Sequence, residues 1–216
     1  MRFHLECNQL KNTEVLISGS KSISNRLLIL KSLYENISIL NISSSDDTKF
    51  LEKALQLIDK NEINIGHAGT AMRFLTALLS YNTTKNIKLF GSKRMHKRPI
   101  GILVNSLNEL GASIEFVENY NFPPLLIKPA TMVGKKIRVK SGISSQFISS
   151  LLLIGPKLKG GIEIELDDTE TSFPYIEMTI NLLKKIGVDV NHKDRIIKVN
   201  ELNKICLLYT SDSADD

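Results

Sequence analysis

Gly19-Ser20-Lys21-Ser22-Ile23-Ser24-Asn25-Arg26 is the stretch around which the predicted fold is organised. It ends a short apolar strand, Val15 to Ile17, and opens an apolar helix, Ile23 to Leu33. The first turn of a helix presents unpaired backbone N–H groups and the positive end of the helix dipole, and both attract anions. The stretch therefore predicts an anion-binding turn. An ordinary capped helix with solvated charges is the alternative.

Side chains in this turn favour the anion site. Ser20 or Ser22 can cap the helix. Lys21 opposes the helix dipole, which costs about 0.3–1 kcal/mol unless an anion offsets it. Ser22 and Arg26 lie four residues apart, so the hydroxyl and the guanidinium share one helix face.

The pattern of strand, glycine and helix recurs along the chain. One series of helices is predicted to open at Ser22, Thr70 and Ser144, and a second series at Asp46, Pro99 and Pro174. In the second series, Pro99 and Pro174 lie 75 positions apart, and Gly111 and Gly187 lie 76 apart. Each of these two glycines is predicted to end its helix and to release the chain into an alternating strand.

This register predicts an α/β (α+β) fold built from three β-α-β-α-β-β units, spanning about residues 15–65, 66–134 and 135–200. Pseudo-threefold symmetry would bring equivalent helix N-termini to one side of the domain. The polar turns, distant in sequence, would then form a single surface.

The turns at the second unit supply backbone and charge. Gly66 and Gly69 allow close approach of a ligand to the backbone, and Thr70 is a candidate cap. A basic run from Ser92 to Pro99 leads into the next helix. Within it Arg98, extended because a proline follows, is the predicted anion ligand, whereas Lys93 and Lys97 are expected to be solvated.

The turns of the third unit supply neutral hydrogen-bonding groups. Ser144, Ser145 and Gln146 precede a very apolar helix, and a cap explains only Ser144. Ser172 is predicted to cap the last helix, beside Tyr175.

Composition restricts the class of protein. The chain has 216 residues, 42% hydrophobic and 24% charged, which is ordinary for a globular protein. No 18-residue apolar run and no signal peptide are evident, so a cytoplasmic location is expected. Cys7 and Cys206 are the only cysteines, and the histidines lack ligand spacing, so no metal is expected.

The net charge of +5 leaves nucleic acid, membrane surfaces and small anions open as partners. Aromatic residues are only 6% with no tryptophan, which disfavours stacking on bases. A compact, multiply anionic small molecule fits better than nucleic acid or a membrane. A non-catalytic anion- or RNA-binding repeat domain is an alternative.

Five motifs in this order resemble 5-enolpyruvylshikimate-3-phosphate synthase (3-phosphoshikimate 1-carboxyvinyltransferase): GSKSISNR, AGTAMR, RMHKRPI, SSQF and SFPYI, across residues 2–205. The resemblance implies an enolpyruvyl transferase-like inside-out barrel domain. It also implies transfer of the enolpyruvyl group of phosphoenolpyruvate to the 5-hydroxyl of shikimate 3-phosphate, in chorismate and aromatic amino acid biosynthesis. No cofactor is implied.

The resemblance also assigns residues to the two ligands. For shikimate 3-phosphate it implies Lys21, Ser22, Arg26, Ser144, Ser145, Gln146, Ser172 and Tyr175. For phosphoenolpyruvate it implies Lys21, Gly69, Arg98 and Gln146. His67, Arg73 and Arg94 are auxiliary candidates, and no residue of this chain is expected to be catalytic in the sense of proton transfer.

Two residues depart from the family pattern. His67 stands where better-known members carry asparagine, and Phe74 replaces a common proline, which is interpreted as a packing difference. The sister UDP-N-acetylglucosamine enolpyruvyl transferase is a further alternative. It is expected to have Lys-Asn at the first turn and a reactive loop cysteine, whereas this chain has Lys21-Ser22 and no cysteine between positions 7 and 206.

Length is the larger departure, because the family's chain is about twice as long. We therefore expect the N-terminal half of such an enzyme, inactive alone, with the full-length enzyme a monomer. Residues 1–14 are expected to be a strand segment that packs with the second domain. Residues 15–205 form the three-repeat domain, and 206–216 are interpreted as a non-native tail that does not continue the strand pattern.

Overall fold

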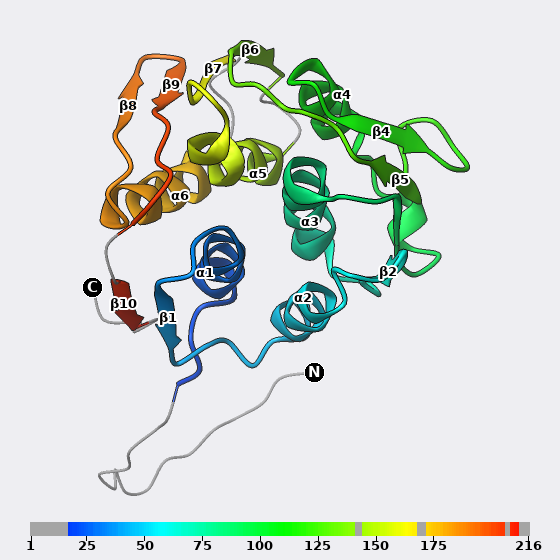
Figure 1. The fold of residues 1–216 in the computed structure, drawn as a ribbon. Coiled ribbons are helices and arrows are strands. Elements are labelled where there is room, and N and C mark those ends of the chain that lie inside the picture. The colour runs from blue at the N-terminus through cyan, green and yellow to red at the C-terminus, as the bar shows by residue number, and fades with distance from the viewer. Residues whose placement is uncertain (1–16, 141–143, 168–171, 206–207, 212–216) are drawn as a thin grey trace, which may run out of the picture.

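The computed structural model describes residues 17–140, 144–167, 172–205 and 208–211 (Figure 1). The helices in this part of the chain are α1 Lys21–Leu33, α2 Asp46–Gln56, α3 Gly69–Asn82, α4 Gly101–Glu109, α5 Ser145–Ile154 and α6 Phe173–Lys185, with short 3-10 turns η1 Met95–Lys97 and η2 Gly155–Lys157. The strands are β1 Ile37–Leu40, β2 Glu62–Asn64, β3 Ile87–Phe90, β4 Ser113–Phe116, β5 Leu125–Lys128, β6 Lys136–Val139, β7 Ile162–Leu166, β8 Val190–Lys193, β9 Ile196–Val199 and β10 Leu208–Ser211.

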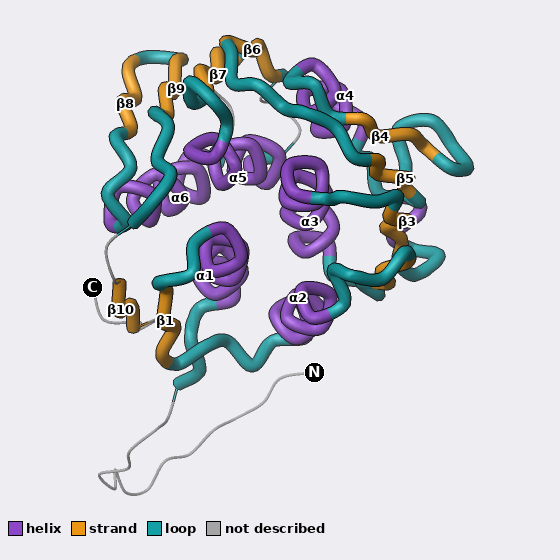
Figure 2. Tube along the Cα trace, in the orientation of Figure 1, coloured by secondary structure: helices purple, strands orange, loops and turns teal. Residues whose placement is uncertain are grey.

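The helices lie inside and the strands lie on the outside (Figure 2). α1, α3 and α5, the first helices of the three units, pack against one another. Around them α2 contacts α3, α4 contacts α5 and α6 contacts α1, so the second helix of each unit reaches the first helix of the next. This cyclic contact pattern confirms the predicted pseudo-threefold arrangement.

Two sheets have the same topology. One has the order β2-β3-β5-β4 and the other β6-β7-β9-β8. In each, the first two strands are parallel and the remaining neighbours are antiparallel. The chain order β2-α3-β3-α4-β4-β5 and β6-α5-β7-α6-β8-β9 is therefore the predicted β-α-β-α-β-β unit, formed twice.

The first unit differs from the prediction. Residues 57–61 alone separate α2 from β2, too few for the two closing strands of a unit. β2 pairs with β3, so the second sheet begins at Glu62 rather than after residue 65, where the sequence analysis divided the chain. β1 pairs instead with β10, so residues 208–211 form a strand parallel to β1.

Three predicted helix ends agree with the structure. Gly111 and Gly187 have positive φ angles of 100° and 92° and end α4 and α6 as predicted. Ser144 accepts a hydrogen bond from the backbone N–H of Gln146 and caps α5, also as predicted.

Other predicted ends are wrong in detail. Thr70 lies inside α3, whose N-cap position is Ala68. Ser20 and Ser172 occupy N-cap positions, but neither side chain makes a capping hydrogen bond. α4 begins at Gly101, because Ile100 and not Pro99 adopts the N-cap position.

The predicted strand Val15 to Ile17 and the segment 1–14 fall mostly outside the described residues. Ile17, which is described, is 67% exposed and belongs to no strand.

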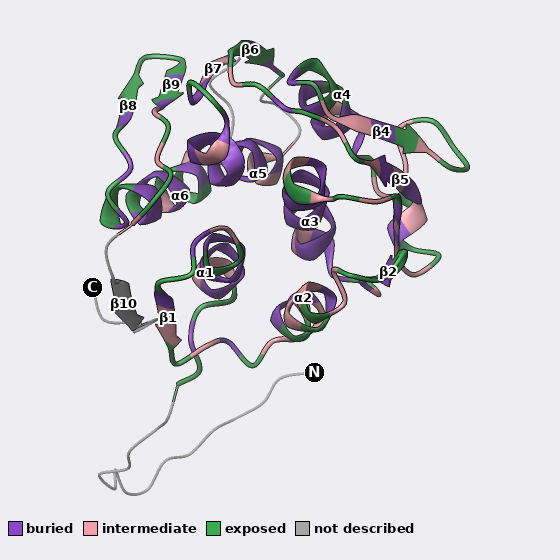
Figure 3. Ribbon diagram, in the orientation of Figure 1, coloured by how far each residue is buried: buried purple, intermediate pink, exposed green. Residues whose placement is uncertain are grey.

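The core lies between the helices and between the helices and the buried faces of the strands (Figure 3). Buried residues cover nearly the whole of α3 and, in α5, every residue from Phe147 to Ile154. Phe74 is 1% exposed, and the guanidinium carbon of Arg26 lies 5.5 Å from the centre of its ring. Phe74 is thus a core residue between α3 and α1.

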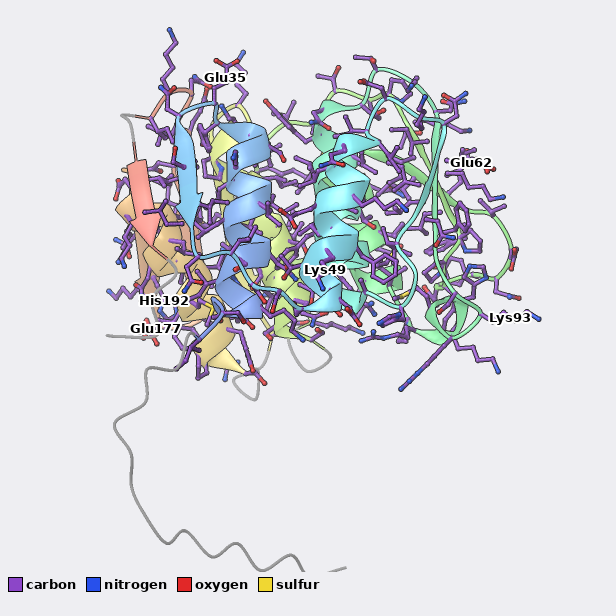
Figure 4. All side chains as sticks on the ribbon, turned by 90° about the horizontal axis from the view of Figure 1, so that it is seen from below. Glu35, Lys49, Glu62, Lys93, Glu177 and His192 are labelled. Atoms are coloured by element: carbon purple, nitrogen blue, oxygen red, sulfur yellow. The ribbon has the colours of Figure 1, made fainter. Side chains whose placement is uncertain are left out.

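The N-terminal ends of the helices share one edge of the molecule (Figure 4). Lys49 in α2, Glu177 in α6 and Lys93 before α4 lie toward that edge, whereas Glu35, which follows α1, lies at the opposite edge. Within the described residues, no helix has both the length and the apolar character that a membrane span requires.

Replacing Phe74 with alanine should lower the free energy of unfolding by about 3–5 kcal/mol, because a buried aromatic ring is lost and a cavity remains. The measurement is urea denaturation followed by far-UV circular dichroism. Tyr120→Ala is the matched control, because Tyr120 is 69% exposed and its loss should cost less than about 1 kcal/mol. Similar losses in both variants would contradict the assignment of Phe74 to the core.

Candidate functional site

A cavity of about 340 Å³ opens where α1, α3, α5 and α6 begin, and we call it the serine cavity. Its lining residues are Lys21, Ser22, Arg26, Thr70, Ser144, Ser145, Gln146, Ser172 and Tyr175. The eight residues that the sequence analysis proposed for shikimate 3-phosphate all line it. They come from two of the predicted units, so the fold brings together turns that are more than 120 positions apart in sequence.

The serine cavity is positive and rich in hydrogen-bonding groups. Lys21 and Arg26 supply two cations, and no acidic residue is among the described residues that line it. Four serine hydroxyls and one threonine hydroxyl surround these cations, together with the Gln146 amide and the Tyr175 ring. Such a set suits a ligand that has both a phosphate and several hydroxyl groups.

Arg26 is the most buried cation of the site, with 3% exposure. Its Nε donates to Thr179 Oγ1 at 2.7 Å, its Nη1 to the Ser22 carbonyl at 2.8 Å, and its Nη2 to both Ser149 Oγ at 3.0 Å and the Tyr175 carbonyl at 2.9 Å. Desolvation by burial lowers the pKa of Arg26 to about 10, which still leaves the guanidinium charged at neutral pH.

Thr70 is the one lining residue that sequence reasoning assigned differently. The sequence predicts a cap at Thr70, but in the second position of α3 its side chain lines the cavity and accepts a 3.4 Å hydrogen bond from Gln146 Nε2. The sequence signal for a place in the site is that Thr70 directly follows Gly69 of the Gly-x-x-Gly turn. Thr70 links α3 to α5 across the mouth of the site.

A second cavity, of about 390 Å³, is lined by His67, Arg94, Met95 and Arg98, and we call it the arginine cavity. Two cations and a histidine therefore face the same space. The rings of His67 and Phe50 pack in a T-shaped arrangement, with their centres 5.3 Å apart. Arg98 has the extended backbone predicted from the following proline, with φ −100° and ψ 118°.

The residues proposed for phosphoenolpyruvate are divided between the two cavities. Lys21 and Gln146 line the serine cavity, whereas Arg98 lines the arginine cavity. Gly69 lies against the guanidinium of Arg98, which occupies the space that a β-carbon on residue 69 would need. The first turn of α3 therefore lines the serine cavity through Thr70 and, through Gly69, contacts the arginine that lines the other cavity.

Among the auxiliary candidates, His67 and Arg94 line the arginine cavity, and Arg73 lines neither cavity. Arg73 is 5% exposed and donates to the carbonyls of Gly69 and Pro99, both at 3.1 Å. Burial, and secondly the charge of Arg98, lower the pKa of Arg73 to about 10. Arg73 thus ties the Gly69 turn to the loop that carries Arg98.

Part of the predicted site lies outside the described residues, namely 141–143 before Ser144 and residue 171 before Ser172. Within the described residues, no group of three or more histidine, cysteine, aspartate or glutamate side chains is arranged to hold a metal ion.

Comparison with known proteins gives a consistent picture. The family model described as EPSP synthase (3-phosphoshikimate 1-carboxyvinyltransferase) matches residues 52–208. A 3-phosphoshikimate 1-carboxyvinyltransferase of Bacteroides fragilis (strain YCH46) is 45% identical over 217 residues, covering 99% of this chain and 52% of the relative. One from Sulfurovum sp. (strain NBC37-1) is 36% identical over 207 residues, covering 84% of this chain and 48% of the relative.

The fold has a match among solved structures. An EPSP synthase from Acinetobacter baumannii superposes with a TM-score of 0.78 at 19% sequence identity, over 91% of this chain and 48% of that chain. The chain thus spans about half the length of the relatives that it matches. The family model matches most residues of this chain, and the relative from Bacteroides fragilis is 45% identical over 99% of this chain. The chain therefore belongs to the EPSP synthase (3-phosphoshikimate 1-carboxyvinyltransferase) family.

Proposed function

We propose that this chain is the half of a 3-phosphoshikimate 1-carboxyvinyltransferase that binds shikimate 3-phosphate in its serine cavity. The observation that carries the proposal is the convergence of Lys21, Arg26 and the serine hydroxyls on one space at the starts of four helices. The cations and helix N-termini suit the phosphate and carboxylate of this ligand, and the hydroxyls suit its ring hydroxyls.

The arginine cavity is the proposed site of phosphoenolpyruvate. Arg98 against the Gly69 backbone offers a guanidinium, which binds carboxylate or phosphate through two parallel hydrogen bonds. Lys21 and Gln146, on the serine cavity, are proposed to contact both ligands, because Gln146 bonds to Thr70 and the adjacent Gly69 lies against Arg98. The two anionic reactants would then lie side by side.

The proposed reaction transfers the enolpyruvyl group of phosphoenolpyruvate to the 5-hydroxyl of shikimate 3-phosphate and releases phosphate, in the cytoplasm and without a cofactor. The residues of this chain bind and orient the two reactants, which lowers the entropic part of the barrier. Fixed cations also stabilise charge that develops during addition and elimination. The groups that transfer protons are proposed to lie in the half of the relatives that this chain does not span.

The 216-residue chain should bind shikimate 3-phosphate in isothermal titration calorimetry, and Lys21→Met should weaken this binding about tenfold, because a charge-assisted contact to the ligand is lost. Lys31→Met is the matched control, since Lys31 lies exposed in the last turn of the same helix. Shikimate, which lacks the phosphate, should bind more weakly than shikimate 3-phosphate. No heat with shikimate 3-phosphate would refute the proposed function.

Arg98→Ala should weaken phosphoenolpyruvate binding about tenfold or more when it is titrated into the chain saturated with shikimate 3-phosphate. Lys97→Ala removes the same charge from the neighbouring exposed position, which lines neither cavity, and should change the affinity less than twofold. Equal effects of the two substitutions would show that only the general charge of the loop matters, against a specific role for Arg98.

A further inference from the structure

The Arg26 guanidinium is held by two buried hydroxyl groups that lie behind the serine cavity. Thr179 in α6 and Ser149 in α5 are both 0% exposed, and neither lines the cavity. They accept hydrogen bonds from Nε and Nη2 of Arg26, and the Thr179 hydroxyl lies 3.0 Å from Ser149 Oγ. The two hydroxyls thus join α5 and α6 to the arginine that α1 supplies.

These contacts leave one N–H group of the Arg26 guanidinium without a hydrogen-bond acceptor among the described residues. A guanidinium has five N–H groups. Contacts to Thr179, Ser149 and the carbonyls of Ser22 and Tyr175 occupy four of them. The fifth, on Nη1, has no acceptor among the residues that the structure describes, and Arg26 lines the serine cavity.

The acceptors around Arg26 are neutral. No carboxylate forms an ion pair with Arg26 in the described part of the chain, whereas exposed arginines such as Arg138 are paired with Glu165 and Asp167. Hydroxyl and carbonyl oxygens hold the guanidinium in position without cancelling its charge. A carboxylate in their place would compete with an anionic ligand.

We propose that Thr179 and Ser149 are positioning residues that hold the Arg26 guanidinium so that its remaining Nη1–H group meets the anionic ligand of the serine cavity. The inference rests on the proposed function of that cavity and extends it to residues that do not contact the ligand. An arginine held in its bound geometry before the ligand arrives loses less conformational entropy on binding, and this raises the affinity.

Thr179→Val tests the role of the hydroxyl, because valine keeps the shape of the side chain and removes the acceptor. The affinity of the 216-residue chain for shikimate 3-phosphate should fall about tenfold by calorimetry, and Thr179→Ser should restore it to within about twofold. Thr76→Val is the matched control. Thr76 is equally buried, and among the described residues its hydroxyl donates to the Met72 carbonyl within α3 and makes no hydrogen bond with Arg26, so its substitution should leave the affinity unchanged.

A double-mutant cycle separates positioning from a general structural role. If Thr179 acts through Arg26, Thr179→Val should weaken binding less than twofold in an Arg26→Lys background, because lysine has no Nε–H group to be held. Should the loss be the same in both backgrounds, the inference fails while the proposed function stands. Absence of binding by the unmutated chain refutes the proposed function and the inference with it.

An NMR measurement covers the case in which Thr179→Val fails to fold. Ser149→Ala is a smaller deletion in the same network. In the unmutated chain the Arg26 Nη2–H signals should exchange slowly with solvent, and Ser149→Ala, which removes one acceptor of Nη2, should speed this exchange and weaken binding several-fold. Unchanged exchange and unchanged affinity in this variant would overturn the inference.

Discussion

Three helices pack against one another in the core, while their first turns supply polar groups to the site. The rest of the structure depends on this arrangement. α1, α3 and α5 meet at the centre, where their buried surface is mainly apolar but also includes hydrogen-bonded polar side chains such as Arg26, Arg73 and Ser149. Their N-terminal ends reach one edge of the molecule. Because helix N-termini attract anions, the packing that brings these helices together also places anion-binding groups next to one another.

In each of the three central helices, a side chain donates a hydrogen bond to the backbone carbonyl four residues earlier. Arg26 in α1 donates to the carbonyl of Ser22, four residues earlier, and Arg73 in α3 donates in the same way to Gly69. The pattern continues in α5, where the Ser150 hydroxyl donates to the carbonyl of Gln146. The first faces a cavity, the second braces the loop of a neighbouring arginine, and the third is a buried hydroxyl.

The sequence predicted the helices and the residues of the serine cavity well, because both depend on local patterns that repeat in register. Gly111 and Gly187 end their helices as predicted, since an αL position favours glycine. The eight residues proposed for shikimate 3-phosphate line one cavity, although their individual contacts with a ligand are still a prediction.

Other features depend on pairing between distant segments, which a linear pattern does not show. The assignment of β2 to the second sheet and the pairing of β1 with β10 are of this kind. Thr179 and Ser149 escaped notice for a related reason. A buried serine or threonine within an apolar helix looks like an ordinary core residue until the fold places an arginine against it.

The hydroxyl groups around Arg26 have a consequence for how the site responds to solvent and ligand. A guanidinium has no acceptor, so the oxygens of Thr179 and Ser149 must both accept from it, and their own protons must turn away from it. The dipoles of both hydroxyls are therefore oriented with their negative ends toward the cation before any ligand enters. These two hydroxyl groups should therefore need little reorientation when a ligand enters. Their alignment is completed when the chain folds and not when the ligand binds.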